Sequence, residues 1–354
     1  MITARNYAAH AVRDLRRVMV RLEQKFSGSP SVKIDAAMME LVAREMTKCP
    51  HFAIPDGGRI LQDGLKGLQG MKVRLPYKSM TIEYYMGGDL PDEDKFDRTT
   101  GTPRINVNRR VLFVQERSVE DVQKEMQEAM DRLAPVHPDL AKQVANSSPE
   151  AYGAGGITVF ACFSSPPSNC FVMHPVAATI SFDWEKGLDL AKGVVPKGGG
   201  VVAFGGIMCL PWCFESTLNA FRDPKVAWRV SMEDMGDEVA TVLSLCEALA
   251  CSNVHAEPME GSLSPNENRK RIASGQLPLY ETKVLVVSTP VQIHKKGEPQ
   301  GTHASPREHL RRGHIRVLRR GEPLEERIWV QQCIVNPGGP GRVDKTYSVI
   351  GGQP

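Results

Sequence analysis

Arginine and histidine side chains gather in one short window of the sequence, and their chemistry is that of anion binding. Residues 301–320 hold six arginines against a single acid, Glu308, so the window carries a formal charge of +5. The whole chain carries +3, so the other residues sum to −2. Because an arginine fork pairs with two anionic oxygens at once, this window indicates binding to phosphate, to RNA or to an acidic surface.

The candidate binding residues lie in this window and on two strands. The residues of the window are His309, Arg311, Arg312, His314 and Arg316. Trp329, in the apolar run that follows, and Glu83, an acid in an otherwise apolar strand, are supporting positions. The paired arginines could equally contact Glu83 or Glu257 and hold the C-terminal strand on the sheet, which would make them architectural.

Histidine catalysis is the alternative chemistry. His309 or His314 could act as the general base of a ribonuclease while arginines hold the scissile phosphate. The two histidines are five residues apart, so neither a helix nor a strand would place them on one face, which disfavours a metal site. The eight cysteines are typical of buried free thiols and lack zinc-ligand spacing. We expect no metal, no cofactor and no catalytic residue, and therefore a protein that is not an enzyme.

Apolar periodicity predicts the elements that position these residues. The expected helices cover residues 5–26, 32–46 and 232–250, the last capped by Ser231 with Asp234. The expected strands cover residues 75–85, 104–116, 156–163, 176–182, 201–204 and 281–288, the last in a central position. This order predicts an α+β fold: a mixed, largely antiparallel sheet packed with helices, an N-terminal helical segment and a basic C-terminal hairpin-like segment.

The chain divides into two predicted parts. Residues 1–300 form an α+β core domain with N-terminal helices, and residues 301–354 form a basic segment with a final strand and a loose tail. The polar stretch 289–306 is a predicted linker. No apolar run reaches the length of a membrane span and the first residues lack a signal-peptide pattern, so we expect a cytoplasmic protein with no membrane partner.

One sequence pattern resembles a known family. It is His309-x-Arg-Arg-Gly-His314, followed by the strand that contains Trp329 and ends at Asn336. The pattern is similar, over residues 307–336, to a family of phage- and plasmid-borne proteins that includes a type V-A anti-CRISPR protein. Looser similarity covers residues 75–83 and 256–258. That family usually has a proline before the first histidine and a tryptophan after the second, where this chain has Glu308 and Ile315.

The resemblance implies a function that composition alone would not suggest. The anti-CRISPR member binds the N-terminal peptide of a CRISPR effector nuclease as it leaves the ribosome, and the encoding mRNA is lost. By this resemblance the chain would act in the host bacterial cell, bind a nascent peptide of a defence nuclease in a pocket, and lower its expression. The basic segment would face the ribosome or the mRNA. Plain RNA binding and a histidine-dependent ribonuclease are the alternatives.

Overall fold

The computed structural model describes most of the chain. The described residues are 6–58, 60, 74–86, 109–121, 155–164, 170–182, 204–259, 263–288, 309–311, 314–330 and 333–335, with a few single positions between 124 and 138. The predicted linker at 289–306 and the predicted tail at 337–354 lie outside them.

Two helices open the fold where the sequence predicts them. Helix α1 covers Tyr7–Lys25 and helix α2 covers Pro30–Met46. The Ser29 hydroxyl accepts the Val32 N–H, and Pro30 occupies the first turn of α2, where its missing N–H costs nothing. The apolar stripe of α1 is buried through Ala8, Ala11, Val12 and Leu15. Both predicted N-terminal helices are therefore confirmed.

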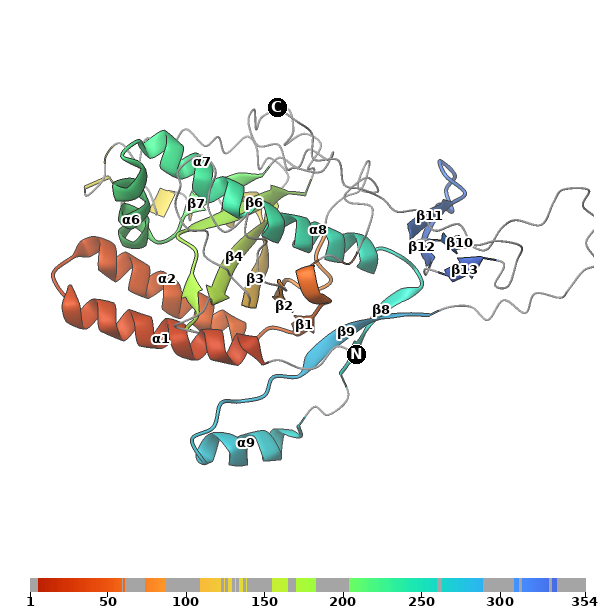
Figure 1. The fold of residues 1–354 in the computed structure, drawn as a ribbon, viewed down its shortest axis with the longest axis horizontal. Helices are drawn as coiled ribbons and strands as arrows, with labels where there is room; N and C mark the ends of the chain where they lie inside the picture. Colours follow the sequence, from red (N-terminus) through yellow and green to blue (C-terminus); the bar gives the residue numbers. More distant parts are fainter. Residues whose placement is uncertain are drawn as a thin grey trace, which may run out of the picture.

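A nine-stranded sheet forms the centre of the molecule (Figure 1). Its strands are β1 (His51–Ala53), β2 (Ser79–Tyr85), β3 (Arg109–Arg117), β4 (Gly156–Ser164), β5 (Val172–Met173), β6 (Val176–Ser181), β7 (Gly205–Met208), β8 (Val254–Pro258) and β9 (Thr282–Val287). The order is β7-β6-β4-β3-β2-β1-β9-β8, with β5 paired to β4. Strand β1 is parallel to both of its neighbours, and the other pairs are antiparallel.

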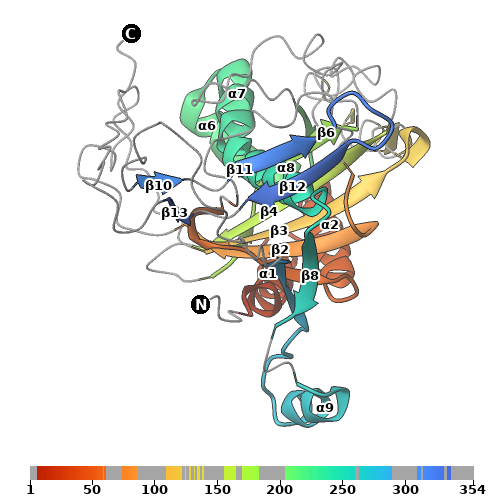
Figure 2. The same ribbon diagram turned by 90° about the vertical axis from the view of Figure 1, so that its right-hand side faces the viewer.

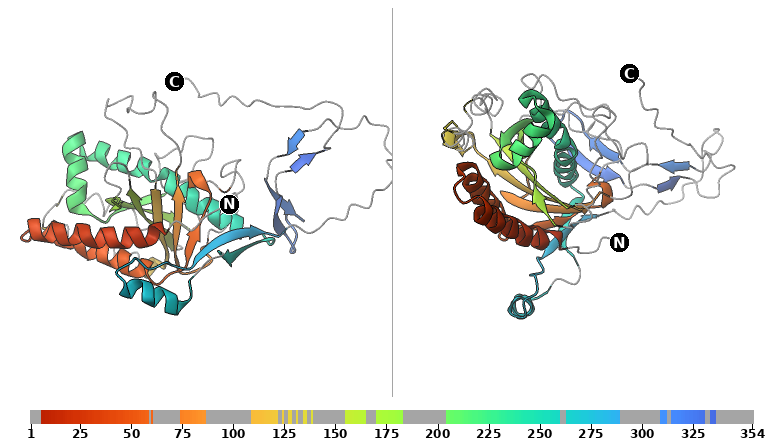
Figure 3. Two further views of the ribbon diagram at one scale, coloured as in Figure 1. Left: turned by 60° about the horizontal axis from the view of Figure 1, so that its bottom comes forward. Right: turned by 60° about the vertical axis from the view of Figure 1, so that its left-hand side comes forward.

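Helices cover both faces of this sheet, as the right-hand view of Figure 3 shows. Besides α1 and α2 they are α6 (Pro211–Phe221), α7 (Pro224–Asp234) and α8 (Gly236–Leu249). Along β3, Val111 and Phe113 join the core under α1 and α2, whereas Leu112 and Val114 join the core under α8. The predicted α+β fold with a mixed, mostly antiparallel sheet is confirmed. The domain boundary at residue 300 stays a prediction.

Three local predictions need correction. The single helix expected at 232–250 is two helices, because the chain bends at Met235, and Ser231 and Asp234 lie inside α7 instead of capping α8. The strand expected at 281–288 exists as β9, but it lies next to the edge strand β8 and not at the centre of the sheet. Of the strand expected at 201–204, residues 201–203 lie outside the described residues, and Phe204 is not in a strand but directly precedes β7, which begins at Gly205. Among the described residues, no helix is long and apolar enough to cross a membrane.

Two helices receive their N-terminal caps from distant carboxylates. Neither Asn6 before α1 nor Leu210 before α6 caps its helix with a side chain. The buried Glu83 accepts the Ala8 N–H at 3.1 Å. The buried Asp35 accepts the N–H groups of the second and third residues of α6 at 3.2 and 3.0 Å. Each carboxylate therefore satisfies backbone donors that a helix start leaves free and ties that helix to another element.

Asp35 should make the stability of the fold depend on pH. Burial raises the pKa of Asp35 from 3.8 to about 6, against the lowering effect of its hydrogen bonds from Cys213 and Trp212. The carboxyl group of Asp35 therefore stays protonated to a higher pH in the folded state than in the unfolded chain. The stability that this difference contributes is fully present below pH 4 and is lost as the pH rises through 6. An asparagine at this position would keep an acceptor and would not titrate. We expect the free energy of urea unfolding of Asp35→Asn to rise relative to the natural protein, by up to about 3 kcal/mol between pH 4 and pH 7. A difference that stays constant with pH would contradict this.

Candidate functional site

The basic C-terminal segment is a β-hairpin. Strands β11 (His314–Leu318) and β12 (Glu326–Val330) pair antiparallel, with His314 opposite Val330. Strands β10 (His309–Arg311) and β13 (Cys333–Val335) pair with His309 opposite Val335. The two pairs form separate two-stranded sheets, and the residues that connect them lie outside the described part of the chain. The predicted hairpin-like segment is confirmed.

The hairpin is attached to the core at the turn between α8 and β8. Figures 1 and 2 place β11 and β12 beyond the C-terminal end of α8, next to the start of β8. The side-chain amide of Asn253 accepts the Trp329 N–H at 2.7 Å and donates to the Trp329 carbonyl at 2.9 Å. The backbone N–H of Ser252 donates to the Arg327 carbonyl at 2.9 Å. Asn253 thus makes the two hydrogen bonds to the Trp329 backbone that a neighbouring strand would otherwise make.

An apolar pocket of about 150 Å³ lies where the hairpin meets the sheet edge. Every side chain that lines it is apolar: Ala53, Pro55, Ile60, Ala248, Val254, Leu285, Val287 and Trp329. They come from β1 and the residues after it, from the end of α8, from β8 and β9, and from β12. A dry cavity of this size accommodates an aromatic ring as large as benzene, so the pocket can hold one apolar side chain of a ligand.

The helix and the hairpin that contribute to this pocket also carry charged groups. Glu247, in the last turn of α8, is buried, and its Oε2 atom has no hydrogen-bond partner among the described residues. Burial raises the pKa of Glu247 to about 7, although Arg327 acts to lower it. On the hairpin, the side chains of Arg316, Arg319 and Arg320 are exposed to solvent. The site therefore combines an apolar pocket, a buried acid and an exposed row of cations.

The structure places several of the predicted site residues on this hairpin. His309 and Arg311 are on β10, His314 and the exposed Arg316 are on β11, and Trp329 is on β12. Arg312 lies outside the described residues. Of these, Trp329 lines the pocket. The role of the others as binding residues stays a prediction.

Glu83 lies away from the hairpin. Its carboxylate meets the N-terminus of α1, on the sheet face opposite α8. Glu257, the other acid considered as a partner for the arginines, is exposed and lies 2.8 Å from the imidazole of His255. Glu83 thus ties α1 to the sheet, and its role as a binding residue stays a prediction.

The cysteines are dispersed through the core. Cys49, Cys162, Cys209, Cys246 and Cys251 are buried free thiols, as expected from the sequence. Burial raises the pKa of each of them, which makes them poor nucleophiles. In the described part of the chain, no group of three or more His, Cys, Asp or Glu side chains is arranged to hold a metal ion.

Sequence reasoning missed two residues of this site. Asn253 follows Ser252 at the end of a helix and is typical of a turn, so nothing local indicates that its amide binds a strand 76 residues away. Glu247 interrupts the apolar stretch 242–250, and an acid at a position expected to be buried was the available signal.

The site is thus a small apolar pocket closed on one side by a cationic hairpin in an α+β protein. Residues 239–337 match the model of the AcrVA2-like family, described as the anti-CRISPR type V subtype A2 family. The family resemblance predicted from the sequence is therefore confirmed over this segment, which covers less than a third of the chain. No curated protein and no solved structure matches the chain.

The attachment of the hairpin should depend on Asn253. Replacing Asn253 with alanine leaves the Trp329 N–H and carbonyl without their partner, a loss of about 1–3 kcal/mol in hairpin docking. We expect faster hydrogen exchange at the Trp329 amide and faster proteolysis within β11 and β12, with exchange in β3 and β4 unchanged. Asn253→Asp keeps the acceptor and loses the donor, so its effect should be intermediate. Unchanged exchange at Trp329 in the alanine variant would show that other contacts hold the hairpin.

Proposed function

We propose that this protein is a non-enzymatic anti-CRISPR protein that binds the N-terminal peptide of a type V-A effector nuclease during translation and lowers expression of that nuclease. One observation supports this proposal most directly. Five of the eight residues that line the pocket, including Trp329, belong to the segment that matches the anti-CRISPR family. The part of the chain with family similarity is thus the part that forms a ligand-sized cavity.

The pocket suits a peptide better than a charged small molecule. Its lining offers apolar contact without a polar side chain, so it would anchor one large apolar residue of an extended peptide. Strand β8 contributes Val254 to the pocket, and as the last strand of the sheet its outer edge pairs with no strand in the described region. A peptide that added to this edge would satisfy backbone groups while one side chain entered the pocket.

The hairpin supplies the second part of the proposal. Arg316, Arg319 and Arg320 are exposed on the hairpin. Arg311, Arg312 and His314 are the other basic residues in this part of the sequence. A nascent peptide is always close to ribosomal RNA and to its own message, both of which are polyanions. Attraction to these phosphates would keep the protein near the exit of the ribosomal tunnel, where the pocket could bind a side chain of the emerging peptide.

Trp329 should control peptide affinity. Truncating a central aromatic anchor typically costs about 2–4 kcal/mol, so Trp329→Ala should weaken binding of a synthetic peptide with the N-terminal sequence of a type V-A effector nuclease roughly a hundredfold. Trp329→Phe keeps a ring and should lose less. Leu324→Ala is the matched control, because Leu324 is on the same hairpin, is 67% exposed and does not line the pocket. Equal affinity of the Trp329→Ala and Leu324→Ala variants, measured by titration calorimetry, would overturn the pocket assignment.

A reporter experiment should separate recognition of the peptide from recognition of the message. The nuclease N-terminal sequence is fused to a reporter, and reporter mRNA is measured with and without the protein. Synonymous recoding should leave the loss of mRNA intact, whereas a frameshifted peptide from nearly the same message should abolish it. If the frameshifted reporter is lost equally, the protein recognises RNA sequence and the peptide proposal fails.

A further inference from the structure

An arm projects from the sheet edge between β8 and β9. It contains helix α9 (Pro265–Ala273), none of whose residues is buried. Figures 1 and 2 show α9 standing away from the rest of the molecule. The arm therefore adds almost nothing to the hydrophobic core, and the usual explanation for a surface helix, burial of one apolar face, does not apply to it.

The arm is nevertheless held in a defined shape. Ser264 and Glu267 form a reciprocal capping box at the start of α9. The side-chain amide of Asn268 accepts the Leu279 N–H at 3.0 Å and donates to the Leu279 carbonyl at 2.9 Å. The Arg271 guanidinium donates to the Leu277 carbonyl at 2.6 Å. These bonds join α9 to the returning chain, so the arm is preorganised without a core of its own.

Three consecutive cations occupy this preorganised helix: Arg269, Lys270 and Arg271. In the described part of the chain, no carboxylate forms an ion pair with any of them, and Glu267 is engaged in the capping box. Arg269 and Lys270 are exposed, whereas Arg271 is partly buried and donates to the Leu277 carbonyl. Successive helical residues are rotated by about 100°, so the two exposed cations point in different directions and can contact separate phosphates.

Helix α1 extends the same cationic surface. Arg13, Arg17, Arg21 and Lys25 recur every four residues and form one ridge along the helix. Arg13 and Arg17 contact the buried Asp14, whereas Arg21 and Lys25 are exposed and have no carboxylate partner among the described residues.

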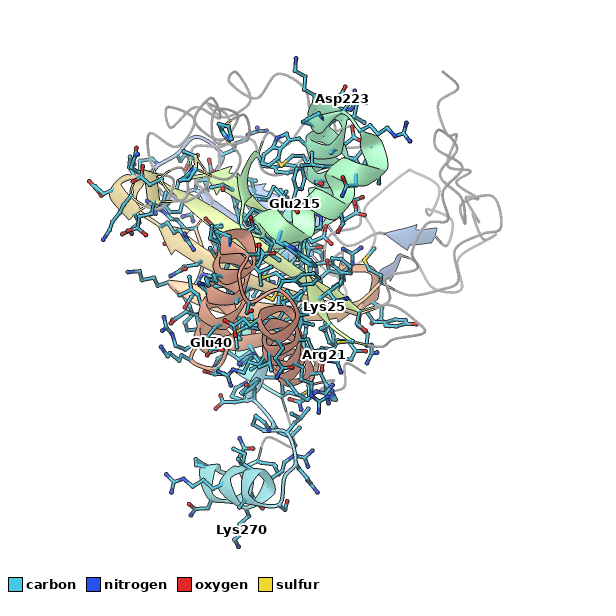
Figure 4. All side chains as sticks on the ribbon, turned by 90° about the vertical axis from the view of Figure 1, so that its left-hand side faces the viewer. Arg21, Lys25, Glu40, Glu215, Asp223 and Lys270 are labelled. Carbon is cyan, nitrogen blue, oxygen red and sulfur yellow. The ribbon has the colours of Figure 1, made fainter. Side chains whose placement is uncertain are left out.

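The base of the arm connects it to this ridge. Tyr280, at the end of the arm, packs into the core under α1 and α2 and stacks on His51, with the ring centroids 4.2 Å apart. Figure 4, in which Arg21, Lys25 and Lys270 are labelled, shows α9 below α1, and Figure 1 shows the same arrangement. The arm is therefore a neighbour of helix α1, the helix that carries the ridge.

We propose that the α1 ridge and the α9 arm together bind the phosphate backbone of structured RNA. An RNA duplex carries a row of phosphates along each backbone beside its wide, shallow minor groove, so the exposed Arg269 and Lys270 of a helix lying across that groove can contact separate phosphates. The ridge would follow the backbone that continues past the groove. This surface is separate from the pocket and from the cationic hairpin, so its function does not rest on peptide binding. It would give the protein a second, sequence-independent hold on a large RNA such as that of the ribosome.

The test removes charges in pairs and compares variants of equal net charge. Arg269→Gln with Lys270→Gln alters the arm, and Arg21→Gln with Lys25→Gln alters the ridge. These four side chains are on the surface, so folding should be unaffected. Lys225→Gln with Arg229→Gln on α7 is the matched control, near the labelled Asp223 at the other end of Figure 4. Binding of a fluorescent RNA duplex is measured by anisotropy over a series of KCl concentrations, with circular dichroism and thermal melting as checks on folding.

We expect both test pairs to weaken RNA binding at least about tenfold at low salt. The slope of the logarithm of the RNA binding constant against the logarithm of the salt concentration should fall in magnitude by about 1.5, because each lost phosphate contact removes about 0.7–0.9 from it. The control pair should change the slope little, and all three variants should keep the affinity for the nuclease peptide. Equal losses in the control would mean attraction by net charge alone and would overturn the proposal. Absence of RNA binding would overturn the proposal. A cellular partner that stays bound to this surface after ribonuclease treatment would also overturn it, and would indicate an acidic protein as the ligand.

Discussion

Buried carboxylates that cap distant helices are the interaction on which the rest of this structure depends. Glu83 binds the start of α1, Asp35 binds the start of α6, and Asp14 accepts the Phe171 N–H at 3.0 Å. A buried charge without partners would be strongly destabilising, so each carboxylate is stable only when its helix or loop is in place. The helix N-termini carry partial positive charge, which adds to the attraction. These ties fix the helical layers on both faces of the sheet, and the sheet in turn presents the β8 edge to the hairpin.

The predictable part of the fold is the part governed by hydrophobic periodicity. Alternating apolar residues predicted β3, β4 and β6, and the apolar stripe predicted α1, because burial against a continuous core decided each of them. The break at Met235 could not be predicted, since α7 and α8 both contribute to one core and the apolar pattern runs through the bend. Helix α9 was missed for the opposite reason: hydrogen bonds from Asn268 and Arg271, and not a buried stripe, determine its structure.

The sequence predicts the residue types of the candidate site but not its geometry. The cationic window and Trp329 are visible in the sequence because charge clustering and a lone large aromatic residue are local signals. The pocket is not visible, because its lining comes from segments between Ala53 and Trp329 that only the sheet order β1-β9-β8 brings together. Glu83 illustrates the same limit. An acid in a buried strand needs a partner, which the sequence does indicate, but the partner is a backbone N–H 75 residues earlier.

The segment with family similarity depends on the scaffold outside it. Helix α8 is buried through Val239, Val242 and Leu243, and these side chains share a core with β2, β3, β4 and β6, all of which precede the matched residues. Strand β9 is held by β1, which also precedes them. Residues 239–337 alone would expose the apolar face of α8 and lose the Ala53 wall of the pocket. The preceding scaffold is constrained only to bury α8 and to pair with β9, a requirement that many apolar sequences meet. The matched segment must in addition keep the amide of Asn253 in register with Trp329, which requires one particular side chain and not merely an apolar one.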